Sequence, residues 1–147
     1  MSIRPALDTD MEPIGALLAS SALPVADLAT SRIAFLVDDR NGKLAGTVGL
    51  ERYDDVGLLR SLAVAKELRG SGCGKALVEA MERRAIELGI DELVLLTQTA
   101  EPFFQALGYR AIARGDAPPV VQASAEFASI CPASAICMAK RLAPADG

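Results

Sequence analysis

Residues 68–76 read LRGSGCGKA, a run with glycine at positions 70, 72 and 74 and basic residues close to both ends. The run follows VGLLRSLAV at 56–64, which predicts a strand, and precedes KALVEAMERRAIELG at 75–89, whose apolar residues have helical spacing. A strand that turns through glycines into a helix directs backbone amides and the positive end of the helix dipole toward one point. The segment therefore predicts an anion site, most simply a phosphate.

Two kinds of phosphate loop compete for this segment. A nucleoside-triphosphate loop needs G-x-x-x-x-G-K followed by Ser or Thr as a magnesium ligand. Its first glycine would fall on Arg69, and its hydroxyl position is Ala76, so both requirements fail. The other interpretation is R-x-x-G-x-G, with Arg69, Gly72 and Gly74, which suits a pyrophosphate bound without metal. A glycine-rich turn that binds nothing is the third interpretation, and it stays open at this point.

The composition excludes several kinds of chemistry. There is no histidine, which removes Ser-His-Asp and Cys-His nucleophiles and most zinc sites. Cys73, Cys131 and Cys137 leave at least one thiol unpaired, so we expect a reducing cytoplasm, with packing as the simplest role for the last two. The net charge of -4 argues against nucleic acid. Without a leader-like N-terminus or a long apolar run, neither export nor a membrane is expected.

Spacing and turn signals predict the other elements. Strands are expected at 2–6, 32–39, 44–53, 56–64, 92–98, 109–114 and 135–142, and helices at 8–23, 75–89 and 100–108. Asn41-Gly42 predicts a tight hairpin, and Thr9 with Glu12 predicts a capping box. Residues 115–134 carry little signal, and 143–147 are expected to fray. Together these features predict one α+β domain built around one sheet.

The stretch LLRSLAVAKELRGSGCGKALVEAMERRA resembles the signature segment of the GNAT superfamily of acyl-CoA-dependent N-acyltransferases. The matching residues are Leu62, Ala63 and Val64, then Arg69, Gly72 and Gly74. AEPFFQALGYR resembles the second signature of the family, and the element order fits over nearly the whole chain. The resemblance implies a GNAT N-acetyltransferase domain over 1–147, with a mostly antiparallel mixed sheet of about six to seven strands and about four helices.

The resemblance also implies acetyl-CoA as the co-substrate, with no metal. Amides of the glycine loop would bind the CoA pyrophosphate, and the edge of strand 62–64 would bind the pantetheine arm. In this family that strand diverges from the next one, here 93–97, and the thioester and the amine meet in the gap. The cofactor-binding residues expected on this basis are Leu62, Ala63, Val64, Arg69, Gly70, Ser71, Gly72, Cys73, Gly74 and Lys75.

Acyl transfer needs a neutral amine, and at pH 7 roughly one α-amine in seven is neutral, against fewer than about one lysine-type amine in a thousand. An α-amine therefore needs only a modest base. Glu51 is the candidate, because GNAT enzymes often place a carboxylate base in this neighbourhood. The alternative interpretation is that Glu51 is a solvent-exposed glutamate at the end of a strand. Glu101 is a weaker candidate, since the helix dipole also explains a glutamate in a first turn.

The usual GNAT acid is a tyrosine shortly before a Leu-Gly-aromatic turn, and that position here is Phe104, which cannot protonate a thiolate. Tyr109 follows Gly108, where the family packs an aromatic ring against the core. The CoA thiolate would leave unprotonated, or water, Tyr53 or Cys131 would replace the acid. A catalytically silent acetyl-CoA sensor is therefore an alternative, as is a structural module without a ligand.

The segments GLERYDD, LLRSLAV, LLTQTAEPFFQALGY and EFASICPASAICMAK resemble the GNAT subgroup associated with arsenic-resistance operons. That resemblance implies a small-molecule amine as substrate, such as an amino acid or the antimetabolites arsinothricin and phosphinothricin. Arg60, Arg110 and Thr97 are the expected substrate-binding residues, with Arg52 as a further cation, because arginine suits a carboxylate. A homodimer through the strand at 135–142 is also expected, since GNAT proteins often pair there.

Overall fold

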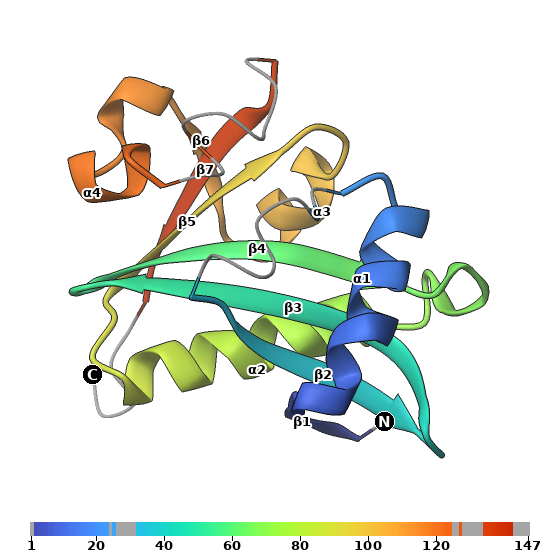
Figure 1. Cartoon of the computed structure of the whole chain (residues 1–147). Coiled ribbons are helices and arrows are strands. Elements are labelled where there is room, and N and C mark those ends of the chain that lie inside the picture. Colours follow the sequence, from blue (N-terminus) through green and yellow to red (C-terminus); the bar gives the residue numbers. More distant parts are fainter. Residues whose placement is uncertain (1, 24, 26–31, 125–126, 128–133, 143–147) are drawn as a thin grey trace. The chain divides into compact units, whose positions relative to one another are not determined.

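The computed structural model describes residues 2–23, 25, 32–124, 127 and 134–142, so the predicted tail at 143–147 and Cys131 lie outside the described residues. The strands are β1 (Ile3–Pro5), β2 (Ala34–Arg40), β3 (Lys43–Tyr53), β4 (Val56–Val64), β5 (Glu92–Thr97), β6 (Arg110–Ile112) and β7 (Ile136–Arg141) (Figure 1). The α-helices are α1 (Met11–Ser20), α2 (Cys73–Glu87), α3 (Glu101–Ala106) and α4 (Pro119–Gln122). All seven predicted strands and all three predicted helices are confirmed, with ends shifted by a few residues.

Within the described residues, hydrogen bonding gives a seven-stranded sheet in the order β1-β2-β3-β4-β5-β7-β6. The pairs β1–β2, β2–β3, β5–β7 and β6–β7 are antiparallel, and β4–β5 is parallel. The predicted α+β fold with a mostly antiparallel mixed sheet is therefore confirmed. The chain divides into two compact units, Met1–Glu51 with Arg60–Arg83 and Arg52–Leu59 with Arg84–Gly147, which are called unit 1 and unit 2 below.

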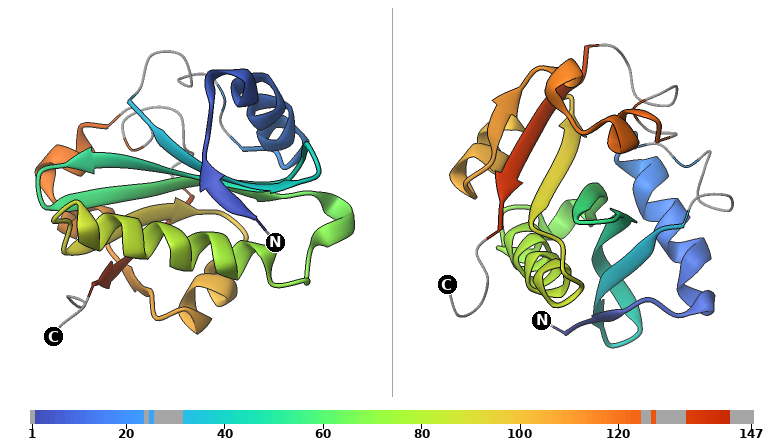
Figure 2. Two further views of the ribbon diagram at one scale, coloured as in Figure 1. Left: turned by 90° about the horizontal axis from the view of Figure 1, so that it is seen from below. Right: turned by 90° about the vertical axis from the view of Figure 1, so that its left-hand side faces the viewer.

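In unit 1, strand β2 lies between two helices. Phe35 and Val37 pack in one apolar cluster with Ile14 and Leu18 of α1. Side chains alternate across a strand, so Asp38 points to the other side, where its carboxylate accepts a hydrogen bond from the first residue of α2. Figure 2 shows α1 and α2 on opposite sides of β2 and β3. The apolar positions of β2 and α1 thus account for one face of this unit.

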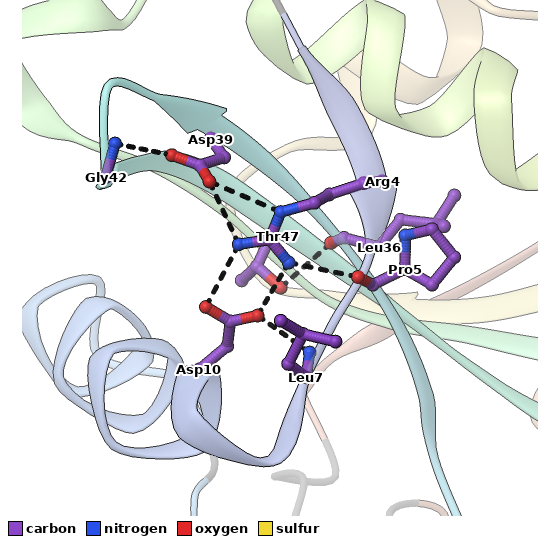
Figure 3. A network of polar contacts seen from close by, with 8 residues as sticks. All are labelled: Arg4, Pro5, Leu7, Asp10, Leu36, Asp39, Gly42 and Thr47. Atoms are coloured by element: carbon purple, nitrogen blue, oxygen red, sulfur yellow. Dashed lines mark hydrogen bonds and ion pairs between the residues drawn. The ribbon is translucent and has the colours of Figure 1, made fainter.

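Arg4 connects three segments of unit 1 through charged hydrogen bonds (Figure 3). Its guanidinium donates to Asp10 at 2.7 Å and to Asp39 at 3.0 Å, and Asp39 also accepts from the Gly42 amide of the β2–β3 turn. The predicted capping box of Thr9 and Glu12 is wrong. A 3-10 turn at Asp8–Asp10 precedes α1, and the Asp10 carboxylate accepts the Leu7 amide at 2.7 Å, because its side chain reaches back across that turn.

The hairpin predicted at Asn41-Gly42 is confirmed. Asn41 and Gly42 have φ angles of 56° and 84°, and this pair of left-handed residues matches the twist of the two strands. The register of β2 against β3 shifts between Asp38 and Asp39. The turn and this shift together fix the register that brings Gly46 opposite Asp38.

Unit 2 is built around β5. The start of β4 pairs with it in parallel, Val56 opposite Glu92 and Leu58 opposite Val94, and β7 pairs with it along its whole length. Val56, Leu58 and Val94 form an apolar cluster that also includes Cys137, which is 2% exposed. The predicted packing role of Cys137 agrees with this position, and burial raises the pKa of its thiol to about 11.

Strand β7 lies between β5, which pairs with it along its whole length, and β6, which pairs with Cys137–Ala139. The chain thus returns after β6 and inserts its last strand beside β5. The homodimer expected through the strand at 135–142 stays a prediction.

Residues 115–134, in which little structure was expected, contain part of a 3-10 turn at Arg114–Asp116 and the short helix α4. Gln122 of α4 donates to the Ala117 carbonyl at 2.6 Å, and Val121 is fully buried in the apolar cluster of unit 2. Along the described ranges, the helices are all too short or too polar to cross a bilayer.

Candidate active site

Strand β4 contains a bulge at Ser61. This residue has a φ of 57°, a left-handed conformation that a residue with a Cβ seldom adopts inside a strand. The Arg60 side chain contacts Glu51 of β3, and the Ala63 side chain belongs to the apolar cluster of Ile14 and Leu18 of α1. In unit 1, Gly49 lies beside Phe35 of the α1 cluster, and Glu51 is two residues further along the same face. Arg60 and Ala63 therefore share a face although they are three residues apart, which is the shift that a β-bulge produces.

Glu51 and Arg60 form an ion pair inside unit 1, with 2.9 Å between a carboxylate oxygen and a guanidinium nitrogen. Their side chains are 6% and 1% exposed. The reading of Glu51 as an exposed strand-end glutamate is therefore wrong, because β4 and its arginine cover it. Arg60 also donates through Nε to Ser61 Oγ at 3.1 Å. The structure thus brings together the predicted base, Glu51, and the predicted substrate-binding residue, Arg60, as an ion pair.

The glycine loop has the backbone freedom that its sequence predicts. Gly70 and Gly72 have φ angles of 83° and 90°, and no atom lies within 4 Å of where a Cβ would be on either residue. The Gly72 carbonyl accepts the first helical hydrogen bond of α2, from Ala76 N at 3.0 Å. An exposed loop with left-handed glycines that opens directly into a 15-residue helix can turn its amides toward an anion.

Basic side chains flank this loop in different ways. The Arg69 side chain donates to the Val64 carbonyl at the end of β4 and to Ser21 Oγ after α1, both at 3.3 Å. Arg69 therefore fastens the loop to its neighbours as well as adding charge. Lys75 is exposed in the first turn of α2. Leu62 and Val64 are partly buried, while Ala63 is 4% exposed.

Cys73 points its side chain away from the exposed side of the loop. Its Sγ donates to Asp38 Oδ2 at 3.2 Å, and burial, followed by the adjacent Asp38 carboxylate, raises the pKa of the thiol to about 11. Burial alone would raise the pKa of Asp38, but hydrogen bonds from the Ser2 amide, Cys73 and Arg40 lower it overall. Only the backbone of Cys73 is thus placed to contribute to an anion site.

Gly46 of β3, which lies beside the start of α2, was not selected from the sequence. A Cβ there would be 2.8 Å from Leu77 Cδ1, 3.0 Å from Cys73 Sγ and 3.0 Å from the Ala63 carbonyl. Glycine lets β3 approach both the start of α2 and the end of β4. A glycine inside an otherwise apolar strand is the signal that could have found it, because such glycines often mark close backbone approach.

Phe104 and Tyr109 form the aromatic end of unit 2. Phe104 is 6% exposed, and its ring meets the Tyr109 ring edge-on at 5.5 Å between centroids. Tyr109 is 3% exposed, which agrees with its predicted packing role. Lys140 of β7 donates to the Leu107 carbonyl at 2.9 Å and lies 5.5 Å from the centre of the Tyr109 ring. The Leu-Gly-aromatic turn is thus held from β7.

The remaining candidates lie in unit 2. Thr97 ends β5, and its Oγ1 accepts the Ala100 amide at 3.0 Å, which forms the turn into α3. Arg110 is exposed at the start of β6. Arg52 is exposed and donates weakly to the Asp54 carbonyl at 3.4 Å. Within the part of the chain that the structure describes, no cluster of three acidic, cysteine or histidine side chains is arranged to hold a metal.

The α+β fold, in which a bulged strand leads through a glycine loop into a helix, is shared with N-acetylglutamate synthase from Neisseria gonorrhoeae, solved with coenzyme A and N-acetyl-glutamate. The TM-score is 0.81 and the identity 21%, over 97% of this chain and 35% of that one. The chain belongs to the acetyltransferase (GNAT) family, whose model matches residues 8–109. The GNAT resemblance of the sequence is therefore confirmed.

Curated relatives agree with this family. An uncharacterized N-acetyltransferase of Chlorobaculum tepidum is 37% identical over 79 residues, which are 53% of this chain and 50% of that protein. An amino-acid acetyltransferase of Mannheimia succiniciproducens is 32% identical over 78 residues, 52% of this chain and 18% of that protein. The matched regions thus span half or less of the length of these relatives.

Proposed function

We propose that the protein is an N-acetyltransferase that moves an acetyl group from acetyl-CoA to the amine of a small molecule. The observation that carries this proposal is the continuous path in unit 1 from the Ser61 bulge through Leu62–Val64 to the glycine loop. The loop amides from Arg69 to Lys75 would bind the CoA pyrophosphate without metal, and β4 would bind the pantetheine arm by backbone hydrogen bonds. The family and the coenzyme A bound to the Neisseria neighbour support this assignment.

The proposed reaction is direct attack in a ternary complex. A proton leaves the substrate ammonium for the Glu51 carboxylate, through water, and the neutral nitrogen then attacks the thioester carbonyl. The carbon–sulfur bond breaks, CoA leaves as a thiolate, and the new amide loses its second proton to water. Phe104, a buried ring packed on Tyr109, supplies no proton to that thiolate. Positioning of the two substrates then provides much of the rate.

The proposed acceptor is the α-amine of an amino acid or of an amino-acid antimetabolite such as arsinothricin or phosphinothricin. An amino-acid acetyltransferase among the relatives and the N-acetyl-glutamate bound to the Neisseria neighbour support the class. The resemblance to the arsenic-resistance subgroup motivates the narrower choice. Arg110 and Thr97 are proposed to contact the substrate. The sequence also predicted this role for Arg60, but its guanidinium bonds to Glu51 and Ser61.

The test is thiol release from acetyl-CoA with a panel of α-amines, using lysine-type amines as the contrast. Glu51→Gln should reduce turnover at least tenfold at pH 7 with little change in CoA affinity. The deficit should shrink at pH 9, where most α-amines are already neutral. Glu79→Gln, an exposed glutamate of α2, is the matched control. Normal turnover by Glu51→Gln at pH 7 contradicts the base assignment.

A catalytically silent acetyl-CoA sensor is the second candidate, favoured by Phe104 at the position where an acid is usual. Calorimetric binding of CoA without thiol release from any amine in the panel supports the sensor. Absence of CoA binding contradicts both candidates and favours a structural module.

A further inference from the structure

Arg60 joins β3 to the bulge of β4 through two hydrogen-bonded contacts inside unit 1. Its Nε donates to Ser61 Oγ at 3.1 Å, and another guanidinium nitrogen lies 2.9 Å from Glu51 Oε2. The Arg60 side chain is 1% exposed, so this planar group is held in place by its surroundings. A guanidinium presents several donors in fixed directions, which suits it to hold two acceptors at once.

Two features of this cluster call for an explanation beyond stability. A buried ion pair is weak evidence for stabilisation, because the loss of hydration offsets much of the attraction. Ser61, with a φ of 57°, has a backbone conformation that persists only where its neighbours enforce it. The arginine that bonds the Ser61 hydroxyl is the neighbour that also reaches the adjacent strand. The pair and the strained residue are therefore parts of one arrangement.

We propose that Arg60 is a positioning residue for acetyl transfer, which holds Ser61 in its left-handed conformation by linking the Ser61 hydroxyl to Glu51. The bulge sets the direction of Leu62–Val64, since it shifts which face each following residue occupies. This inference rests on the proposed function, in which those residues bind the pantetheine arm. It differs from a role for Arg60 as a direct ligand of the substrate carboxylate.

The two roles predict different kinetics. A positioning residue that acts through the bulge affects acetyl-CoA, so its loss should raise the KM for acetyl-CoA and lower kcat while the KM for the amine changes little. A carboxylate ligand affects the amine, so its loss should raise the KM for the amine. A role in folding alone would lower the melting temperature and leave both KM values of the folded enzyme unchanged.

The experiment uses Arg60→Lys, Ser61→Gly and the double variant Arg60→Lys/Ser61→Gly in the full chain. Lysine keeps a positive charge beside Glu51 but has one nitrogen, so it cannot bond Glu51 and Ser61 with the arginine geometry. Arg60→Lys should lower kcat/KM for acetyl-CoA at least tenfold. Glycine adopts positive φ without a Cβ penalty, so Ser61→Gly makes the enforcing contact unnecessary. The kcat/KM of the double variant for acetyl-CoA should therefore lie within about threefold of that of Ser61→Gly alone, a margin of about 0.7 kcal/mol.

Arg83→Lys, an exposed arginine of α2, is the matched control. Recovery in the double variant supports the proposal. Normal kinetics in Arg60→Lys, a rise confined to the KM for the amine, or a double variant no better than Arg60→Lys overturns it. If Arg60→Lys does not fold, Ser61→Ala compared with Ser61→Gly tests the same link, because alanine lacks the hydroxyl that Arg60 bonds but keeps the Cβ that disfavours a positive φ. Ser61→Ala should raise the KM for acetyl-CoA above that of Ser61→Gly, and equal KM values overturn the proposal. A wild-type chain that neither binds CoA nor releases thiol overturns the proposed function instead, and is recognised before any variant is made.

Discussion

Gly72 offers a way to strain the candidate phosphate loop without filling any space. Its φ is 90°, and no atom lies within 4 Å of the position that a Cβ would take, so Gly72→Ala acts through the backbone alone. An L-residue in the left-handed region costs about 1–2 kcal/mol. The loop is exposed, and we expect it to relax to a negative φ in the free protein rather than to hold this strain. Relaxation would turn the loop amides away from the anion.

Binding of CoA would then have to return residue 72 to a positive φ, at a cost of about 1–2 kcal/mol. The Kd for CoA should therefore rise by about 5- to 30-fold, at about 1.4 kcal/mol for each factor of ten. Gly42→Ala is the matched control, because Gly42 has a φ of 84° and equally open space but lies in the β2–β3 turn. It should lower the free energy of unfolding by a similar amount and leave the Kd unchanged. Calorimetric titration measures the Kd, and urea unfolding measures stability. A Gly72→Ala protein that binds CoA within twofold of wild type refutes the loop assignment.

Three further predictions concern packing and charge. Gly46→Ala should lower the free energy of unfolding by about 1–3 kcal/mol, because a Cβ would lie 2.8 Å from Leu77, whereas Gly115→Ala, in open space, should stay within about 0.5 kcal/mol in urea unfolding. The Arg4 hydrogen bond, followed by the Leu7 amide, lowers the pKa of Asp10 below 3.8, so its contribution to stability is present above that pH and is lost as pH falls through the lowered value. Unfolding midpoints between pH 2.5 and about 6 should therefore depend less on pH in Asp10→Asn, and an unchanged dependence contradicts this. Cys73, with a pKa of about 11, should be alkylated at pH 8 at least tenfold more slowly in the native chain than in urea, by peptide-mapped iodoacetamide labelling; equal rates contradict its burial.

Sequence patterns were informative wherever the local chain determines the structure. Asn41-Gly42 predicted the hairpin because two left-handed residues are needed in that turn. The glycine run predicted a loop between a strand and a helix, and Gly70 and Gly72 of that loop have positive φ, which glycine adopts readily. The capping box at Thr9 and Glu12 failed because a distant residue, Arg4, holds Asp10 in place of a local partner. The residues around a helix start do not indicate a hydrogen bond from a side chain outside that turn, such as the one from Arg4 to Asp10.

The candidate site shows the same division. Glu51 and Arg60 were selected separately, one as a base and one as a cation, and nothing in their spacing indicates that they pair. Their contact depends on the register of β3 against β4 and on the bulge at Ser61. The residue with positive φ in that bulge is a serine, so no glycine in the sequence indicates the bulge. The position of β7 between β5 and β6 was missed because strand order is set by long-range pairing.

The most direct test of the central claim is a titration of ¹⁵N-labelled protein with CoA, followed through its backbone amide resonances. If main-chain nitrogens of the glycine loop bind the pyrophosphate, the largest shifts should fall on residues 69–76, with a second group at 61–65 on β4. The same titration with pantetheine, which lacks the pyrophosphate, should move the second group and leave the first in place. Largest shifts elsewhere, with residues 69–76 unmoved at saturating CoA, contradict the account.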